Sequence, residues 1–299
     1  MTAMARYDYY SDRKILNIDY KYLAEGLAVA KRRRLRSVAI RRLAAPTPRI
    51  HRVDLEPIRN QTWIRVLELD SLVSGREKVV LENIDALYSL RHLRSLDLAA
   101  MPVDLGQFSE LTTLNIELRA QHMPDLGSSP IETVTVMNGP ENTLGPLTRV
   151  KTLRSLQILG STLSSLDGFE KLKTLRFLRL TGSPRVTDAY PISRCRQLQE
   201  LNVEACPRLL DWSSLRAHPA LQTLFLAELQ SLSFVPSLPK LERFSFWDCK
   251  DNDLSPLFRC KHFKQAWFHP SRKRYSHTRA EFDEYLERLE SRRKRAASK

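Results

Sequence analysis

Apolar residues recur in the spacing L-x-x-L-x-L along most of this chain. Residues 153–158 are LRSLQI, and residues 175–180 repeat the spacing as LRFLRL. With any apolar residue allowed at the three fixed positions, the spacing begins at Leu35, Ile64, Leu93, Leu111, Ile131, Leu153, Leu175, Leu198, Leu221, Leu241 and Phe263. Matches that follow one another in this way indicate an internal repeat, and an internal repeat determines the fold class.

Each match predicts a short strand followed by a return segment. Alternate residues of a strand point to one face, and a second apolar cluster about ten residues later belongs to the return. In the coil that begins at Leu153, the return contains Leu163, Leu166, Phe169 and Leu172. One coil cannot bury its own apolar face, so neighbouring coils must stack and form a parallel sheet. The first two starts are each followed by an interval of 29 residues, whereas later intervals are 18 to 23 residues long, so the coil boundaries before Leu93 are the least defined.

These residues resemble the leucine-rich repeat family, whose unit is L-x-x-L-x-L-x-x-N/C-x-L. The segment LKTLRFLRLTGS is similar to the short repeats of phosphatase regulators and bacterial internalins, and LQELNVEACPRL is similar to the cysteine-containing class. The resemblance implies an α/β fold, a leucine-rich repeat solenoid with a curved parallel sheet on the concave face and helical N- and C-terminal caps. The N/C position holds Ser161, Ser183, Cys206 and Cys249, but it departs from the pattern at Leu43, Leu72, Met101, Arg119, Gly139 and Leu229.

Three segments are expected: an N-terminal cap with a helix at 1–34, a solenoid of about 11 coils at 35–270, and a C-terminal capping helix with a basic tail at 271–299. Residues 20–34 carry a helical apolar pattern, and LNIDY at 16–20 predicts an additional strand. Thr278 and Glu281 form a capping-box pattern ahead of an apolar stripe of Phe282, Tyr285, Leu286 and Leu289. We expect this stripe to pack on the last coil, with a partner-binding helix as the alternative, and residues 291–299 to fray.

Charge is concentrated at the two ends. The net charge is +14, with 12 Lys+Arg against 4 Asp+Glu in residues 1–50 and 12 against 5 in residues 261–299. Basic ends could contact nucleic acid or an anionic membrane. However, Lys and Arg are also favourable at a helix C-terminus, and no aromatic residue interrupts AKRRRLRSVAIRR, so we favour a solvated helix end.

The sequence gives no indication of catalysis. It lacks a Gly-rich phosphate loop, the G-x-S-x-G motif and H-E-x-x-H, so neither an enzyme nor a cofactor is expected. Cys260 and His262 precede the last predicted strand whereas His269 lies on it, so these residues and His277 are not expected to converge on a metal. No apolar run is long enough to span a membrane, the N-terminus lacks a secretion signal, and four cysteines are too few for a disulfide scaffold, so a cytoplasmic location is expected.

Function is therefore expected on a surface. Residues two, four and six positions after each start should point to the concave face, because the residues at three and five point inward. This face is predicted to be acidic in the early coils and aromatic in the late ones. The predicted partner-binding residues are Glu68, Asp70, Asp97, Glu117, Phe177, Arg179, Phe225, Arg243, Trp247 and Trp267.

Exposed aromatic residues beside charges are typical of protein interfaces, although the same rings could simply stack across neighbouring strands. The sequence predicts a non-catalytic module that binds a partner protein on its concave face. The resemblance suggests an immunity protein that neutralises a basic toxin such as a nuclease. An RNA- or membrane-associated adaptor that uses the basic ends, and a regulatory scaffold of a phosphatase or ligase, remain as alternatives.

Overall fold

The computed structural model describes residues 6–41, 43, 50–69, 78–99, 103–118, 122–126, 129–141, 143–268 and 274–297. The chain forms two compact units, Met1–Met137 and Asn138–Lys299. Asp70 and His269, together with the atypical positions Leu72, Met101 and Arg119, lie outside the described residues.

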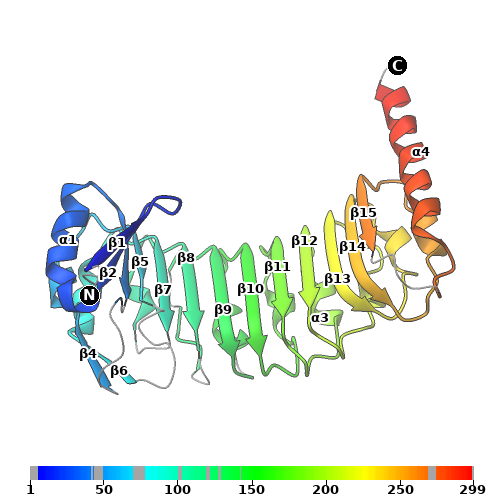
Figure 1. The fold of residues 1–299 in the computed structure, drawn as a ribbon. Helices are drawn as coiled ribbons and strands as arrows, with labels where there is room; N and C mark the ends of the chain where they lie inside the picture. The colour runs from blue at the N-terminus through cyan, green and yellow to red at the C-terminus, as the bar shows by residue number, and fades with distance from the viewer. Residues whose placement is uncertain are drawn as a thin grey trace. The chain divides into compact units, whose positions relative to one another are not determined.

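In the first unit, the strands of the main sheet follow one another in chain order. They are β1 (Tyr7–Tyr10), β2 (Ile15–Asp19), β3 (Ser37–Arg41), β5 (Val66–Glu68), β7 (Ser95–Ala99), β8 (Thr113–Glu117) and β9 (Thr133–Gly139), which begins in this unit (Figure 1). From β2 onward the pairing is parallel, and Ser37, Val66, Ser95, Thr113 and Thr133 lie in register. Each of these residues is two positions after a predicted start, so the repeat register is confirmed here.

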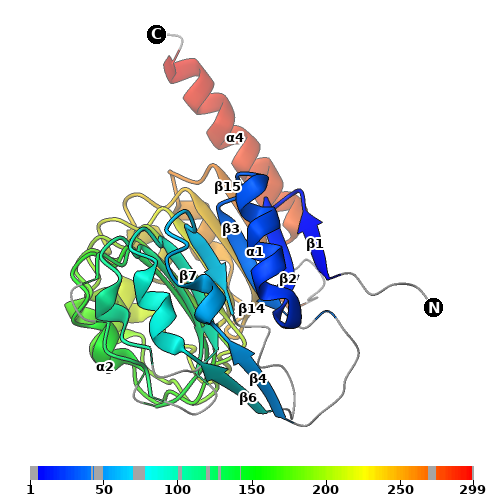
Figure 2. The ribbon, with the colours of Figure 1, turned by 90° about the vertical axis from the view of Figure 1, so that its left-hand side faces the viewer.

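The two long intervals of the first unit contain an additional pair of strands. β4 (Ile50–Asp54) pairs in parallel with β6 (Lys78–Glu82) (Figure 2), and the 3-10 helices η2 (Glu56–Ile58) and η4 (Ile84–Ser89) follow them. The 3-10 helix η5 (Leu105–Gln107) lies in the next return. The 29-residue coils therefore have a second, smaller sheet in their return segments, which the repeat template did not predict.

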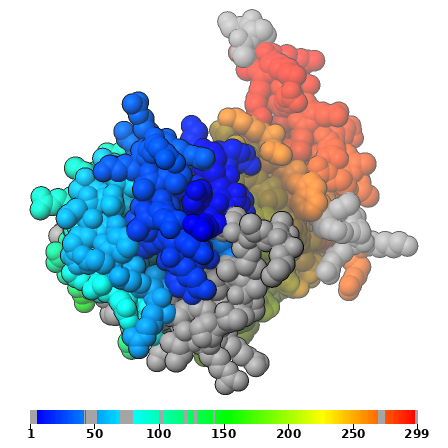
Figure 3. All heavy atoms as spheres, turned by 60° about the vertical axis from the view of Figure 1, so that its left-hand side comes forward, coloured from blue at the N-terminus to red at the C-terminus, as the bar shows by residue number. Residues whose placement is uncertain are grey.

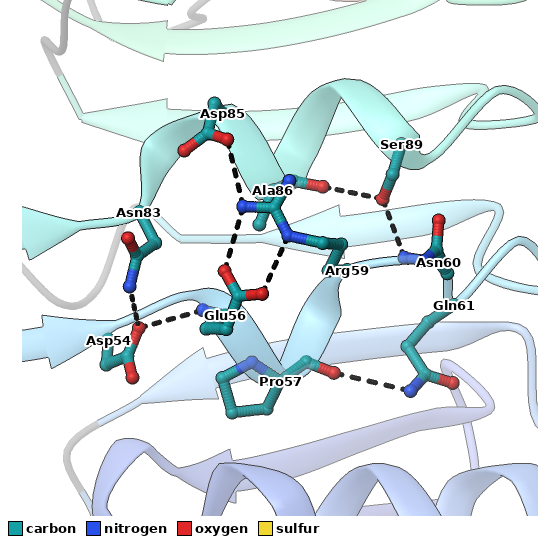
Figure 4. Close-up of polar contacts among 10 residues, drawn as sticks. All are labelled: Asp54, Glu56, Pro57, Arg59, Asn60, Gln61, Asn83, Asp85, Ala86 and Ser89. Atoms are coloured by element: carbon teal, nitrogen blue, oxygen red, sulfur yellow. Dashed lines mark hydrogen bonds and ion pairs between the residues drawn. The ribbon is translucent and has the colours of Figure 1, made fainter.

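Polar side chains join these two long returns (Figure 4). The Arg59 guanidinium donates to Glu56 Oε1 at 2.7 Å and to Asp85 Oδ2 at 2.9 Å, so it links η2 to η4. The hydrogen bonds to Arg59 lower the pKa of both carboxyl groups. Asn83 Nδ2 donates to Asp54 Oδ1 at 2.7 Å in the same region. The network explains how two coils of unusual length stay aligned.

The second unit repeats the same architecture with shorter returns. Its strands are β10 (Ser155–Ser161), β11 (Phe177–Thr181), β12 (Glu200–Glu204), β13 (Thr223–Leu229), β14 (Arg243–Cys249) and β15 (Gln265–Phe268). They pair in parallel in chain order, each first residue against the next. The returns contain α2 (Leu144–Leu147), η6 (Phe169–Lys171), α3 (Tyr190–Ser193), η7 (Ser213–Leu215), η8 (Val235–Ser237) and η9 (Ser255–Arg259).

The core lies between strands and returns, as the pattern predicts. Leu156, Ile158, Leu178 and Leu180 are all 0% exposed, and the predicted return residues 163, 166, 169 and 172 are buried as well. At the N/C position, two neighbouring coils are joined by their serine hydroxyl groups. Ser161 Oγ and Ser183 Oγ are hydrogen-bonded at 2.7 Å, and the two preceding residues, Gly160 and Gly182, both have φ near +70°.

The N-terminal cap consists of η1 (Tyr20–Tyr22), α1 (Leu23–Arg32) and two strands. The predicted strand β2 is present and extends the parallel sheet, and α1 contacts β2 and β3. Contact between α1 and β2 is close, because a Cβ at Gly26 would lie 2.4 Å from Ile18 Cγ2. The antiparallel strand β1, whose residues are all exposed, was not predicted.

The C-terminal cap is α4 (Arg279–Ala297). The predicted capping box is present: the Thr278 amide donates to Glu281 Oε2 at 2.6 Å, and the Glu281 amide donates to Thr278 Oγ1 at 3.3 Å. Phe282 is fully buried and its ring lies 6.4 Å from Phe263 and 5.7 Å from Phe268, so the helix packs on the last coil.

The prediction that the chain frays from residue 291 is wrong for residues 291–297, because α4 continues to Ala297. Ion pairs four residues apart, such as Glu284–Arg288 and Glu290–Lys294, both at 2.6 Å, support the exposed turns of α4. In the part of the chain that the structure describes, no helix has both the length and the apolar composition needed to cross a membrane.

Candidate functional site

We define the open face as the side of the parallel strands formed by the residues two, four and six positions after each repeat start. The residues at three and five fill the core instead. The predicted binding residues within the described ranges all lie on the open face of β5, β7, β8 or β11–β15.

On the open face of the first unit, the acidic residues are partly neutralised within the chain. Glu68 pairs with Arg41 Nη2 at 2.5 Å, and its side chain is 12% exposed. The Arg41 Nε atom also donates to Asn17 Oδ1 at 2.6 Å. Glu68 lies beside Asp97 in the register, and Asp97 accepts a hydrogen bond from Asn115 Nδ2 at 2.7 Å. Glu68 is therefore an internal ion-pair partner rather than a free carboxylate, which the sequence alone did not indicate.

The second unit carries the predicted aromatic residues. Trp247 and Trp267 are 44% and 43% exposed. The Trp247 ring contacts the Phe225 ring edge-on, with centroids 5.4 Å apart. Trp267 lies beside Ser245 in the register, so the two tryptophans are diagonal neighbours on β14 and β15. Phe177 is half-buried on β11. Cross-strand stacking and exposure thus occur together, because the Trp247 ring packs on Phe225 while Trp247 remains 44% exposed.

The two predicted arginines are held by neighbours on the same face. Arg179 Nη2 lies 3.8 Å from Glu204 Oε2, and Arg243 Nε donates to Thr223 Oγ1 at 3.1 Å. Asn202 on β12 pairs with Arg179 on one side and with Phe225 on the other, and it was not among the predicted binding residues. Its Oδ1 atom is buried and, among the described residues, has no hydrogen-bond partner. A buried acceptor of this kind is costly to leave unsatisfied.

A cavity of about 130 Å³ lies at the carboxyl ends of β12, β13 and β14. The residues that line it are Trp247, the acidic residues Glu204 and Glu228, and apolar residues including Leu209. Glu228 pairs with Lys250 Nζ at 2.7 Å, and the same ammonium pairs with Asp248 at 2.8 Å. The hydrogen bonds to these carboxylates raise the pKa of Lys250. The spacing template did not identify Glu228 or Lys250, because both lie after the open-face positions.

The cysteines have the character of core residues. Burial raises the pKa of Cys195 and Cys260 to about 12, so both thiols are protonated at neutral pH. Cys206 at the family's N/C position is buried with its Sγ 3.9 Å from the Leu180 carbonyl oxygen. Among the described residues, no three histidine, cysteine, aspartate or glutamate side chains are arranged to hold a metal ion.

The in-register strands of each unit, with short helical returns behind them and one buried apolar set per coil, define a leucine-rich repeat fold with helical caps. Three solved structures of similar fold have low sequence identity to the chain. An internalin, inlF, from Listeria monocytogenes is 15% identical, with 83% of this chain and 89% of that chain covered and a TM-score of 0.46. A leucine-rich repeat protein from Leptospira interrogans is 16% identical, with 81% of each chain covered and a TM-score of 0.45. TLR13, in a complex with ssRNA13, is 16% identical, with 85% of this chain and 41% of that chain covered and a TM-score of 0.49.

No protein-family model matches the chain, and no curated protein matches its sequence. The similarity to the solved structures concerns the fold alone.

Proposed function

We propose that the chain is a protein-binding module and that its binding site is the open face of β13–β15. The observation that carries this proposal is the exposure of Trp247 and Trp267, at 44% and 43%, next to Phe225. Large rings in water contribute little to folding, whereas a tryptophan that becomes buried at the centre of an interface is a common source of binding energy.

The partner we propose is basic, and the role we propose is neutralisation of a toxin, as in an immunity protein. Glu200 and Glu204 lie on the open face, and Glu228 lines the adjacent cavity with Trp247. A basic side chain of the partner could place its charge near these carboxylates and over the ring of Trp247. In the first unit, Asp97 and Glu117 likewise place acidic side chains on the open face.

The test compares the affinity of a captured partner for the wild-type chain and for two single variants. We expect Trp247→Ala and Trp267→Ala each to weaken binding at least about tenfold, since each removes a ring that the interface would desolvate. Neither variant should change the thermal melting curve by much, because both rings lie outside the core.

Tyr190→Ala is the matched control, because Tyr190 is 55% exposed but belongs to a return segment. It should bind like the wild type. If the two tryptophan variants also bind with wild-type affinity, the open face is not the binding site. For the toxin hypothesis, coexpression of wild-type chain should relieve growth inhibition by the captured partner, and the Trp247→Ala variant should relieve it less.

A further inference from the structure

We propose a second binding site, in the first unit, which holds a single nucleic-acid strand. A cavity of about 280 Å³ is lined by Lys31, Arg34, Leu35, Arg36 and Trp63. Three of the five lining residues are cationic, one is a large aromatic residue, and none is acidic. This site does not depend on the proposed function of the open face.

The fold brings these residues together from two coils. Lys31 lies in the last turn of α1, Arg34 and Arg36 lie between α1 and β3, and Trp63 lies ahead of β5. The Arg65 amide donates to the Arg36 carbonyl at 2.8 Å, which places the two turns side by side. In the sequence, no aromatic residue interrupts the basic run, but the next coil supplies one in space. In the space-filling view, the α1 segment lies beside the light-blue residues of the following coils (Figure 3).

The basic residues continue along the turns that precede the strands. The same backbone contact recurs in the next coil, where the Arg94 amide donates to the Arg65 carbonyl oxygen at 2.8 Å. Equivalent positions on paired strands are about 4.8 Å apart, so the three arginine backbones form a closely spaced row. Arg94 is partly neutralised by Glu110 at 3.5 Å, whereas Arg65 Nη1 contacts the Thr62 carbonyl. The row therefore extends the positive potential of the cavity beyond its own lining.

The helix dipole does not account for this charge. It favours Lys31 and Arg32 in the last turn of α1, but Arg34 and Arg36 lie beyond the end of the helix. Within the described residues, Lys31, Arg34 and Arg36 form no ion pair, and residues 26–41 contain no Asp or Glu. Like charges held this close repel one another, so an anion that binds between them gains the attraction of all three.

The chemistry of the lining favours a nucleic-acid strand over other anions. Arginine and lysine neutralise phosphates, and an aromatic ring stacks on an unpaired base. The Trp63 ring is half-buried, and its Nε1 atom donates to Gln61 Oε1 at 2.9 Å, which fixes its orientation. A phosphate alone or a lipid headgroup would use the cations but not the ring. Bases inside a duplex are already stacked, so a single strand fits the site better than a duplex.

The test measures fluorescence anisotropy of labelled single-stranded RNA and DNA of about 12 nucleotides, a typical length for one binding site, over a range of salt concentrations. We expect the triple variant Lys31→Gln, Arg34→Gln, Arg36→Gln to bind at least about tenfold more weakly at low salt. Because each phosphate contact on a single strand contributes about −0.7 to the slope of log K against log salt, loss of three contacts should reduce that slope by about 2. Melting curves of the variants establish that they are folded.

The matched control removes the same charge from α4, through Arg288→Gln, Arg292→Gln and Arg295→Gln. This control should keep most of the affinity, and an equal or larger loss in it would overturn the assignment to the α1 cavity. Trp63→Ala should weaken binding to the normal strand about tenfold but leave binding to an abasic strand unchanged, whereas Trp63→Phe should retain most of the affinity.

Two competitors separate nucleic acid from other anions. Inorganic phosphate and vesicles that contain phosphatidylserine should each displace the labelled strand poorly. If inorganic phosphate displaces the labelled strand as well as unlabelled strand does, the cavity is a simple anion site. If the vesicles do so, it is a membrane contact, and either result overturns the proposal. Equal sensitivity of the normal and abasic strands to Trp63→Ala would likewise remove the base-stacking role.

Discussion

Leu178 illustrates how a single inward position supports the repeat. Its side chain is 0% exposed, and in the register it lies between Leu156 and Leu201 on the neighbouring strands. We expect Leu178→Asp to unfold the surrounding coils, because a carboxylate there would be buried with no partner, and such substitutions cost more than about 4 kcal/mol. Thermal melting followed by circular dichroism measures the effect.

The neighbouring residue provides the control for this prediction. Arg179→Asp places the same carboxylate one position along the strand, on the open face, and should lower the melting temperature far less. If Leu178→Asp melts like Arg179→Asp, the inward and outward assignments of the repeat are wrong.

A second prediction at the residue scale concerns His218, which is 1% exposed in the return ahead of β13. Its Nε2 atom lies 3.1 Å from the Cys195 carbonyl oxygen, and its Nδ1 atom accepts from the Ala220 amide at 3.4 Å. The contact with Cys195 requires hydrogen on Nε2, and acceptance at Nδ1 requires the neutral ring, so the two together fix the neutral form with hydrogen on Nε2. Burial lowers the pKa of His218 below its ordinary value of 6.5.

A histidine whose pKa is lower in the folded state favours folding when it is neutral. The unfolded chain binds this proton first, so the contribution of His218 is complete above pH 6.5 and is lost as the pH falls from there toward the folded-state pKa. We expect the free energy of unfolding to decrease between about pH 7.5 and about pH 5.5 in the wild type, and to decrease less in His218→Gln, which has no titrating ring. Urea unfolding at both pH values measures the difference. Parallel pH dependences would show that His218 does not titrate in this way.

At the scale of the element, the strands were predictable and their surroundings were not. The template gave every strand of the main sheet from β3 to β15, because inward leucines and their spacing are properties of consecutive residues. It also gave β2, α1 and the capping box of α4, which depend on local patterns. β4 and β6 were missed because a 29-residue interval shows only that the coil is longer, whereas their pairing joins residues 28 apart in the chain, such as Ile50 and Lys78.

For the candidate site, the sequence predicted which residues lie on the open face but not their contacts with residues of other coils. Trp247 and Trp267 were placed on the open face because alternation decides which way a strand residue points. The ion pair between Arg41 and Glu68 was not predicted, since it depends on the length and rotamer of two side chains on different strands. The proximity of Trp63 to Arg34 and Arg36 was missed for a related reason. The contact joins two coils through their turns, where the repeat template fixes no side-chain direction.

At the scale of the whole molecule, the net charge of +14 separates into surfaces of different chemistry. Basic residues gather at the end of α1 and along α4, whereas the open-face acids lie in the coils between these segments in the chain. A basic protein partner and a nucleic-acid strand would therefore not compete for the same residues. Salt should weaken both interactions, but the phosphate contacts more steeply because they release condensed counterions.

A stack of coils also has to be closed at its ends, and α4 performs this role for the second unit. Phe263 and Phe268 of the last coil are each 1% exposed, and the Phe282 ring contacts both. Without α4 these rings would lie in water at an open sheet edge, which promotes association between chains. We expect a chain that ends at His277 to melt at a lower temperature and to associate.

A chain that ends at Ser291 is the control for this last prediction. It keeps Phe282 and Leu289, two buried residues of α4, and loses the last turns with their basic side chains, of which Arg293 is half-buried and donates to the Phe263 carbonyl oxygen. It should therefore remain close to the full-length chain in melting temperature and in mass by size-exclusion chromatography with light scattering. If the chain that ends at His277 also matches the full-length chain in both measurements, α4 does not close the stack. The apolar stripe of α4 would then be available to a partner, which is the alternative role that its sequence allows.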